Sequence, residues 1–179
     1  MTRIFLESLR KGRLSRAVKA SSAGPEYEKA GQELRALIAR HFGRSLQIRE
    51  VDAGSCGACE SEIISACNPI YDIQRFGVDF AASPRHADAL LVTGPVTRNM
   101  ETALLRTYEA MSGPKFVITC GDCALDGGAF KDSYYCAGGA GALLPVAAHV
   151  PGCPPHPMAL VEALLRLLDR LNTEGQPKM

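Results

Sequence analysis

Short apolar runs alternate with longer segments of helical spacing along most of this chain. Leu46, Ile48 and Val51 alternate with polar residues and predict a first strand over residues 45–53. Further apolar runs predict strands over residues 77–83, 87–96, 115–120 and 142–150. Helical spacing predicts helices over residues 26–42, from residue 60 as far as Pro69, over 100–111 and over 157–171. The glycine-rich residues 124–142 are predicted to be irregular.

Strands that alternate with helices are typical of a parallel sheet with helices on both faces. About five strands in a chain of this length predict an α/β fold, a flavodoxin-like doubly wound parallel sheet. The chain has 179 residues, 46% of them hydrophobic, which suffices for one core. We therefore expect a basic helical N-terminal extension over residues 1–43, a flavodoxin-like domain over 44–172 and a flexible tail over 173–179.

Charge is unevenly distributed although the net charge is only +1. Residues 1–50 hold 11 Lys and Arg against 5 Asp and Glu, which leaves the rest of the chain acidic. Residues 1–20 combine this charge with helical spacing and predict an interfacial or partner-docking helix, with an ordinary surface helix or a disordered tail as the alternative. The near-neutral total predicts no nucleic-acid partner. Neither an apolar stretch of the ~18–20 residues that span a bilayer nor a secretory signal is recognisable.

Four of the seven cysteines follow predicted strands, in turns rich in glycine or proline. Cys56 and Cys59 follow the first strand in GSCGACE. Cys123 follows the fourth strand in CGDCALDGG, and Cys153 follows the last in VPGCPPHP. Because parallel strands end at the same edge of a sheet, these turns are expected to converge. Four thiolates at one point form a site for a metal or an iron–sulfur cluster, so an electron carrier is the leading hypothesis.

The local sequence around the first pair favours thiolates. Gly54 and Gly57 allow a tight turn, so that both thiols face the same way. The start of the following helix brings amide N–H groups near the sulfurs, which stabilises thiolate and raises the reduction potential of a bound cluster. Pro154 and Pro155 stiffen the turn at the last cysteine.

A zinc site is the main alternative. Two CxxC pairs, at residues 56/59 and 120/123, would supply four thiolates. The pairs lie about sixty residues apart, unlike the short spacing of zinc ribbons, and Cys153 is left unexplained. A thioredoxin-like redox pair lacks the rest of its pattern. From the residues alone, a [4Fe–4S] cluster, zinc and separate thiols all stay open.

Several segments together resemble the 20-kDa-type iron–sulfur subunit of respiratory complex I and its hydrogenase relatives. They are GSCGACESEI, NPIYDIQRFG, ASPRHADALLVTGPVTRNM, GDCALDGG and VPGCPPHP, and the resemblance runs from about Arg44 to Leu168. It implies one [4Fe–4S] cluster bound by Cys56, Cys59, Cys123 and Cys153. These four cysteines are thus both the expected metal ligands and the expected cofactor-binding residues. It also implies an oxidoreductase subunit whose catalytic metal centre lies in a partner.

The spacing of the first cysteine pair distinguishes members of this superfamily. Complex I subunits carry two adjacent cysteines, whereas this chain has CxxC, as do the small subunits of [NiFe] hydrogenases. The chain is most similar to the small subunit of membrane-bound group 4 [NiFe] hydrogenases, of the formate hydrogenlyase and hydrogenase-4 types. This resemblance implies a proximal cluster beside a [NiFe]-type large subunit, a ferredoxin-like iron–sulfur subunit, membrane-arm subunits, and a peripheral position on the cytoplasmic side of the membrane.

Two other functions stay open. The first is a complex-I-type NADH:quinone oxidoreductase subunit whose cluster reduces quinone, although Met158 stands where that type often has Glu. The second is a zinc-stabilised interaction module without electron transfer.

Glu62 and His156 are candidates for proton chemistry near the cysteines. Glu62 lies where the resemblance places an acidic residue and is a candidate proton relay, with a carboxylate favoured by the helix dipole as the alternative. His156 is a candidate for a hydrogen bond to the cluster or for proton coupling, or else an exposed turn residue. Cys67 is predicted to lie in the core, Cys120 to be a buried free thiol, and Cys136 to be incidental.

Overall fold

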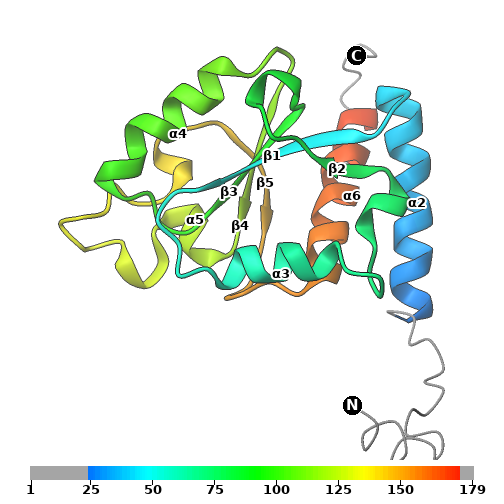
Figure 1. Cartoon of the computed structure of the whole chain (residues 1–179), viewed down its shortest axis with the longest axis horizontal. Coiled ribbons are helices and arrows are strands. Elements are labelled where there is room, and N and C mark those ends of the chain that lie inside the picture. Colours follow the sequence, from blue (N-terminus) through cyan, green and yellow to red (C-terminus); the bar gives the residue numbers. More distant parts are fainter. Residues whose placement is uncertain (1–23, 174–179) are drawn as a thin grey trace, which may run out of the picture.

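The computed structural model describes residues 24–173 (Figure 1). Its helices are α2 (Pro25–Phe42), α3 (Ala58–Ala66), α4 (Arg98–Ala110), α5 (Asp122–Asp126) and α6 (Pro157–Thr173). Its strands are β1 (Leu46–Asp52), β2 (Val78–Phe80), β3 (Ala89–Thr93), β4 (Phe116–Cys120) and β5 (Val146–Val150). Short 3₁₀ turns are η1 (Ile73–Phe76), η2 (Pro84–His86), η3 (Gly128–Phe130) and η4 (Ala140–Ala142). The helix predicted over residues 1–20 lies outside the described residues.

The five strands form one parallel sheet in the order β2-β1-β3-β4-β5, which confirms the predicted flavodoxin-like fold. Helices α2 and α6 cover one face, and α4 and α5 lie on the other (Figure 1). The central strands β3 and β4 are buried at every position, as parallel strands covered on both faces require. Strand β5 begins at Val146, later than predicted, because η4 ends at Ala142 and a turn follows it over Leu143 and Leu144.

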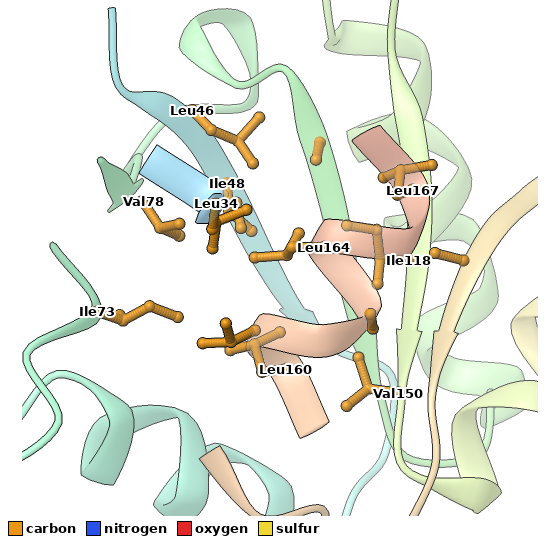
Figure 2. Close-up of a cluster of buried hydrophobic side chains, with 14 of the residues drawn as sticks. Leu34, Leu46, Ile48, Ile73, Val78, Ile118, Val150, Leu160, Leu164 and Leu167 are labelled. Carbon is orange, nitrogen blue, oxygen red and sulfur yellow. The ribbon is translucent and has the colours of Figure 1, made fainter. Parts of the chain in front are cut away.

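The larger part of the core lies between the sheet and the pair α2 and α6 (Figure 2). Leu34 from α2 and Leu164 from α6 meet Ile48 of β1 in this layer, and all three are fully buried. Burying each such side chain contributes about 1.5–3 kcal/mol. Helix α2 falls within the predicted extension over residues 1–43, yet its apolar face belongs to the core of the domain. The proposed division of the chain at residue 43 therefore stays a prediction.

Tyr27 places a hydroxyl in this core that has no hydrogen-bond partner among residues 24–173. The residue is 2% exposed, and the rings of Tyr71 and Phe76 pack edge-on against it at 5.3 and 5.7 Å. Burial raises the pKa of Tyr27 to about 12. Because an unpaired buried hydroxyl costs about 1–3 kcal/mol, we expect Tyr27→Phe to raise the free energy of unfolding by about 1 kcal/mol in urea denaturation.

Tyr71→Phe is the matched control for this prediction. The Tyr71 hydroxyl lies 3.1 Å from Nε2 of His156, so its removal is expected to lower the free energy of unfolding by about 1 kcal/mol. A loss of stability in Tyr27→Phe of the same size as in the control would contradict the prediction.

Candidate functional site

The four predicted cysteines lie at the edge of the sheet where the parallel strands end. Cys56 and Cys59 follow β1, Cys123 lies in α5 directly after β4, and Cys153 follows β5. All four line one small cavity. The rest of its wall consists of Ser55, Ala58, Gly94, Pro95, Asp122, Phe130, Gly152 and Pro154. The expected convergence of these turns is therefore present, whereas ligation by the four thiols stays a prediction.

The thiols are spread around this cavity and do not meet at one point. Within residues 24–173, no three side chains of His, Cys, Asp or Glu gather closely enough to hold a single metal ion. A [4Fe–4S] cluster is larger than an ion and takes one thiolate at each of four corners. The cavity wall is almost entirely apolar, as a water-excluding cluster pocket requires. The residues present therefore fit such a cluster.

The turn that carries the first pair is fixed by local hydrogen bonds. Oδ1 of Asp52 accepts the backbone N–H groups of Gly54 and Ser55, at 2.7 and 2.6 Å. Oγ of Ser55 then accepts the N–H of Gly57 at 2.9 Å. Helix α3 begins directly after Gly57, so Cys59 lies in its first turn, where the helix dipole favours a thiolate.

Cys59 also packs against the end of β4. Gly121 has a φ of +86°, and a Cβ atom at this position would lie 2.6 Å from Sγ of Cys59. Cys120 is 1% exposed, and its thiol donates a hydrogen bond to Cys59. This hydrogen bond lowers the pKa of Cys59 and, together with burial, raises the pKa of Cys120 far above that of a free thiol. Cys120 is thus a buried thiol, as predicted, and is absent from the wall of the four-cysteine cavity.

Asp122 ties the turns of the last two cysteines together. Its backbone N–H donates to the carbonyl of Gly152 at 3.0 Å, and its Oδ1 accepts the N–H of Gly152 at 2.9 Å. Asp122 precedes Cys123 and Gly152 precedes Cys153, so this reciprocal pair fixes the separation of the two ligand-bearing turns. Burial, followed by the charge of Cys153, raises the pKa of Cys123.

Glu62 and His156 lie together, but around a different cavity. They line a smaller space with Ile63, Cys120, Pro155, Pro157 and Leu160. Nδ1 of His156 accepts the backbone N–H of Met158 at 3.2 Å, so the neutral ring carries its proton on Nε2 and donates to Tyr71 at 3.1 Å. Both ring nitrogens therefore already have protein partners. A hydrogen bond from His156 to the cluster and a relay role for Glu62 stay predictions.

Sequence reasoning did not single out Asp122 or His149. Nδ1 of His149 lies 2.9 Å from Oγ1 of the buried Thr119, and its Nε2 lies 3.8 Å from Oδ1 of Asp122. The available signal was a histidine inside the apolar run that became β5, where a buried polar side chain needs a partner. The two remaining cysteines, Cys67 and Cys136, lie outside the four-cysteine cavity.

Two partly buried carboxylates, those of Glu60 and Glu50, lie beside the site. Both carboxylate oxygens of Glu60 are buried without a hydrogen-bond partner in the described part of the chain, and no side-chain cap is formed at α3. Burial and, secondly, the charge of Glu60 raise the pKa of Glu50 on β1. The charge of Glu60 in the first turn of α3 thus acts both on Glu50 of β1 and on Cys59.

The fold and the site define the class, an α/β domain with a flavodoxin-like parallel sheet and a four-cysteine cavity at the carboxyl edge of that sheet. A chain of the [NiFeSe] hydrogenase from Desulfovibrio vulgaris Hildenborough has the same fold, with a TM-score of 0.55 at 19% identity over 75% of this chain and 63% of that one. A chain of the membrane-bound sulfane sulfur reductase, an archaeal respiratory membrane complex, gives a TM-score of 0.66 at 30% identity, over 80% and 78% of the two chains.

Residues 56–167 match the family described as the NADH ubiquinone oxidoreductase, 20 Kd subunit, and the chain belongs to this family. It is 42% identical to the probable membrane-bound hydrogenase subunit mbhJ of Pyrococcus furiosus, over 76% of this chain and 81% of that one. Formate hydrogenlyase subunit 7 of Escherichia coli is also 42% identical, over 70% of this chain but only 49% of its own. An NADH-quinone oxidoreductase subunit of Carboxydothermus hydrogenoformans is 47% identical, over 61% of this chain and 66% of its own.

These relatives confirm the predicted resemblance and are subunits of oxidoreductases. None of the helices within residues 24–173 has the length and apolar character to cross a bilayer.

Proposed function

We propose that this chain is the electron-transfer subunit of a membrane-associated [NiFe] hydrogenase complex and holds one [4Fe–4S] cluster through Cys56, Cys59, Cys123 and Cys153. The observation that carries the proposal is the apolar cavity lined by these four thiols at the carboxyl edge of the sheet. The bound cluster supplies one-electron chemistry. The chain holds it, keeps water from it and orients it, while reversible proton reduction to hydrogen takes place at the nickel–iron centre of a large subunit.

The composition of the cavity wall supports a cluster over zinc. A zinc site built from two CxxC pairs needs Cys120, which lies in the wall of the other cavity, and leaves out Cys153, which lines this one. The spread of the four thiols likewise favours a cubane cluster over a single ion.

Exposed apolar side chains near the site support the proposal that a partner subunit covers it. Cys56 and Cys153 are themselves exposed, and Phe130 of the cavity wall is 51% exposed. Other large apolar side chains exposed on α3, on α5 and on the segment after α5 are Ile64, Leu125, Tyr134 and Tyr135. Such a group on a soluble domain is typical of a protein interface. We assign this surface to the large subunit, with ferredoxin-like and membrane-arm subunits completing the complex.

Anaerobic purification of the complex tests the proposal. We expect iron and acid-labile sulfide in equal amounts, broad absorption near ~400 nm and an EPR signal after reduction with dithionite, all typical of a [4Fe–4S] centre. A colourless chain with stoichiometric zinc would establish the interaction-module alternative in its place.

A quinone-reducing role is the second candidate, because an NADH-quinone oxidoreductase subunit is 47% identical to this chain. The large subunit encoded beside this chain distinguishes the two roles. Two CxxC pairs for nickel in that subunit indicate a hydrogenase, and their absence indicates quinone reduction.

The basic N-terminal segment is proposed to hold the subunit at the cytoplasmic side of the membrane. Deleting residues 1–20 removes six basic side chains (Arg3, Arg10, Lys11, Arg13, Arg16 and Lys19). Each basic side chain near an anionic membrane surface is worth about 1 kcal/mol. We therefore expect the deletion to shift much of the subunit from the membrane to the soluble fraction in cell fractionation. Deletion of residues 174–179 is the control, and unchanged membrane association of the first variant would contradict the proposal.

A further inference from the structure

Cys120 is the last residue of β4 and lies at the carboxyl edge of the sheet, between β3 and β5. In the parallel register it stands opposite Thr93 of β3 and Val150 of β5, so the neighbouring strands hold its backbone from both sides. Its side chain is 1% exposed and belongs to the core beneath α2 and α6. The position of this thiol is therefore set by the sheet and not by a loop.

The thiol of Cys120 meets Sγ of Cys59, one of the four proposed ligands. Cys59 packs against the same core from the first turn of α3. The residue after Cys120 comes so close that a Cβ atom on Gly121 would lie 2.6 Å from Sγ of Cys59. The two thiol groups share a hydrogen bond. Because a ligand cysteine binds as thiolate and has no proton to give, the hydrogen of this bond belongs to Cys120.

The donor at Cys59 differs in kind from the donor at Cys123. Sγ of Cys123 accepts the backbone N–H of Ala129, which no side-chain substitution removes. The donor at Cys59 is a side chain, and it is shielded from water because Cys120 is buried. Burial in apolar surroundings also keeps a cysteine in its protonated form, so this donor is permanent.

Hydrogen bonds to the ligand sulfurs are one of the factors that set the reduction potential of an iron–sulfur centre. Reduction adds negative charge, and a donor directed at a ligand sulfur interacts more strongly with the more negative state. An S–H group is a weak donor. In an interior that excludes water, however, the interaction is not weakened by solvent, so even a weak donor contributes.

We propose that Cys120 is a positioning residue that acts through Cys59, where its S–H group raises the reduction potential of the cofactor in the four-cysteine cavity. The inference rests on the proposed function and adds to it a residue outside the ligand set. One electron enters from a low-potential donor, either dithionite or a reduced ferredoxin-like centre, and leaves again on oxidation. Cys120 keeps its proton in both states, so its contribution to the potential is independent of pH.

The test is the midpoint potential of the cofactor in the intact complex, measured by EPR-monitored redox titration at several pH values. In Cys120→Ala, which removes the donor, the potential is expected to fall below the wild-type value by the same amount at each pH. In Cys120→Ser, which places a hydroxyl donor in nearly the same space, the potential is expected to lie above that of the alanine variant. Cys67→Ala is the matched control, because Cys67 packs against the same core but lies outside the wall of the four-cysteine cavity. It should keep the wild-type potential.

Three outcomes would overturn the inference: an unchanged potential in Cys120→Ala, equal shifts in the alanine and serine variants, and a difference between wild type and Cys120→Ala that varies with pH. Equal shifts would indicate a packing effect, which does not depend on a donor. If the alanine variant fails to load cofactor, Cys120→Val, which fills the space without a donor, must show the same fall. A wild-type complex without any cluster signal overturns the proposed function together with this inference, whereas a normal signal with an unaltered potential in the variants overturns this inference alone.

Discussion

Serine at position 153 is expected to abolish cofactor binding, while alanine at position 120 is expected to leave it intact. The wall of the four-cysteine cavity includes Cys153 and excludes Cys120, although Cys120 belongs to a CxxC pair with Cys123. A serine hydroxyl remains protonated at neutral pH and is a poor substitute for a thiolate ligand. We expect iron and sulfide per chain in Cys153→Ser to fall to background, and the absorption near ~400 nm to disappear with them.

The remaining cysteines complete this series. Cys56→Ser, Cys59→Ser and Cys123→Ser are expected to behave as Cys153→Ser does. Cys67→Ala and Cys136→Ala are controls outside the cavity wall and should keep the wild-type iron content. The zinc alternative makes the opposite prediction for positions 120 and 153, so full metal content in Cys153→Ser with loss in Cys120→Ala would refute the proposed ligand set.

The fold was predictable because its strongest signals are local. The apolar runs that became β3 and β4 are buried on both faces, and alternation with helical segments already implies a parallel sheet. The convergence of Cys56, Cys123 and Cys153 followed from the same logic, since each comes after a strand that ends at the same edge. Helix α2 was likewise predicted, but its packing against α6 was not visible in its own sequence.

The distinction between Cys120 and Cys123 depends on tertiary geometry. Cys120 is the last residue of β4 and shares a face with Ile118, toward the core beneath α2 and α6. The chain turns sharply at Gly121, so that Cys123 faces the other way, into the four-cysteine cavity. The spacing alone suggested that Cys120 and Cys123 form a CxxC pair. Because β4 ends between them, the two thiols lie in the walls of different cavities.

The contacts of Asp122 and His149 were equally hidden from the sequence. They join the turn after β4 to the turn after β5, which lie about thirty residues apart, through one carboxylate oxygen. The five-residue helix α5 overlaps the start of the stretch over residues 124–142 that was predicted to be irregular, and glycines with positive φ at residues 121 and 127 start and end it. Such short elements depend on their tertiary contacts more than on helical propensity.

Gly121→Ala is expected to remove the cofactor without touching any cysteine. The residue has φ and ψ values of 86° and 152°, a region that only glycine adopts readily, and an alanine Cβ would lie 2.6 Å from Sγ of Cys59. Backbone strain alone costs about 1–3 kcal/mol. The clash with Cys59 comes in addition, and relief of it would shift the thiol away from the position that the cavity requires. We expect iron per chain to fall severely and the free energy of unfolding to drop by more than the strain alone explains.

Gly24→Ala is the control that distinguishes the effect of backbone strain from the effect of the steric clash with Cys59. Gly24 has φ and ψ values of 101° and 157° and likewise directly precedes a helix, but a Cβ there meets nothing within 4 Å. This variant should lose at most the strain energy in urea denaturation and should keep the wild-type iron content. Equal iron content in Gly121→Ala and Gly24→Ala would show that the contact between Gly121 and Cys59 is not needed for cofactor binding. The role of the β4 turn in setting the cysteine positions would then have to be abandoned, because the one residue that permits this close approach would be dispensable.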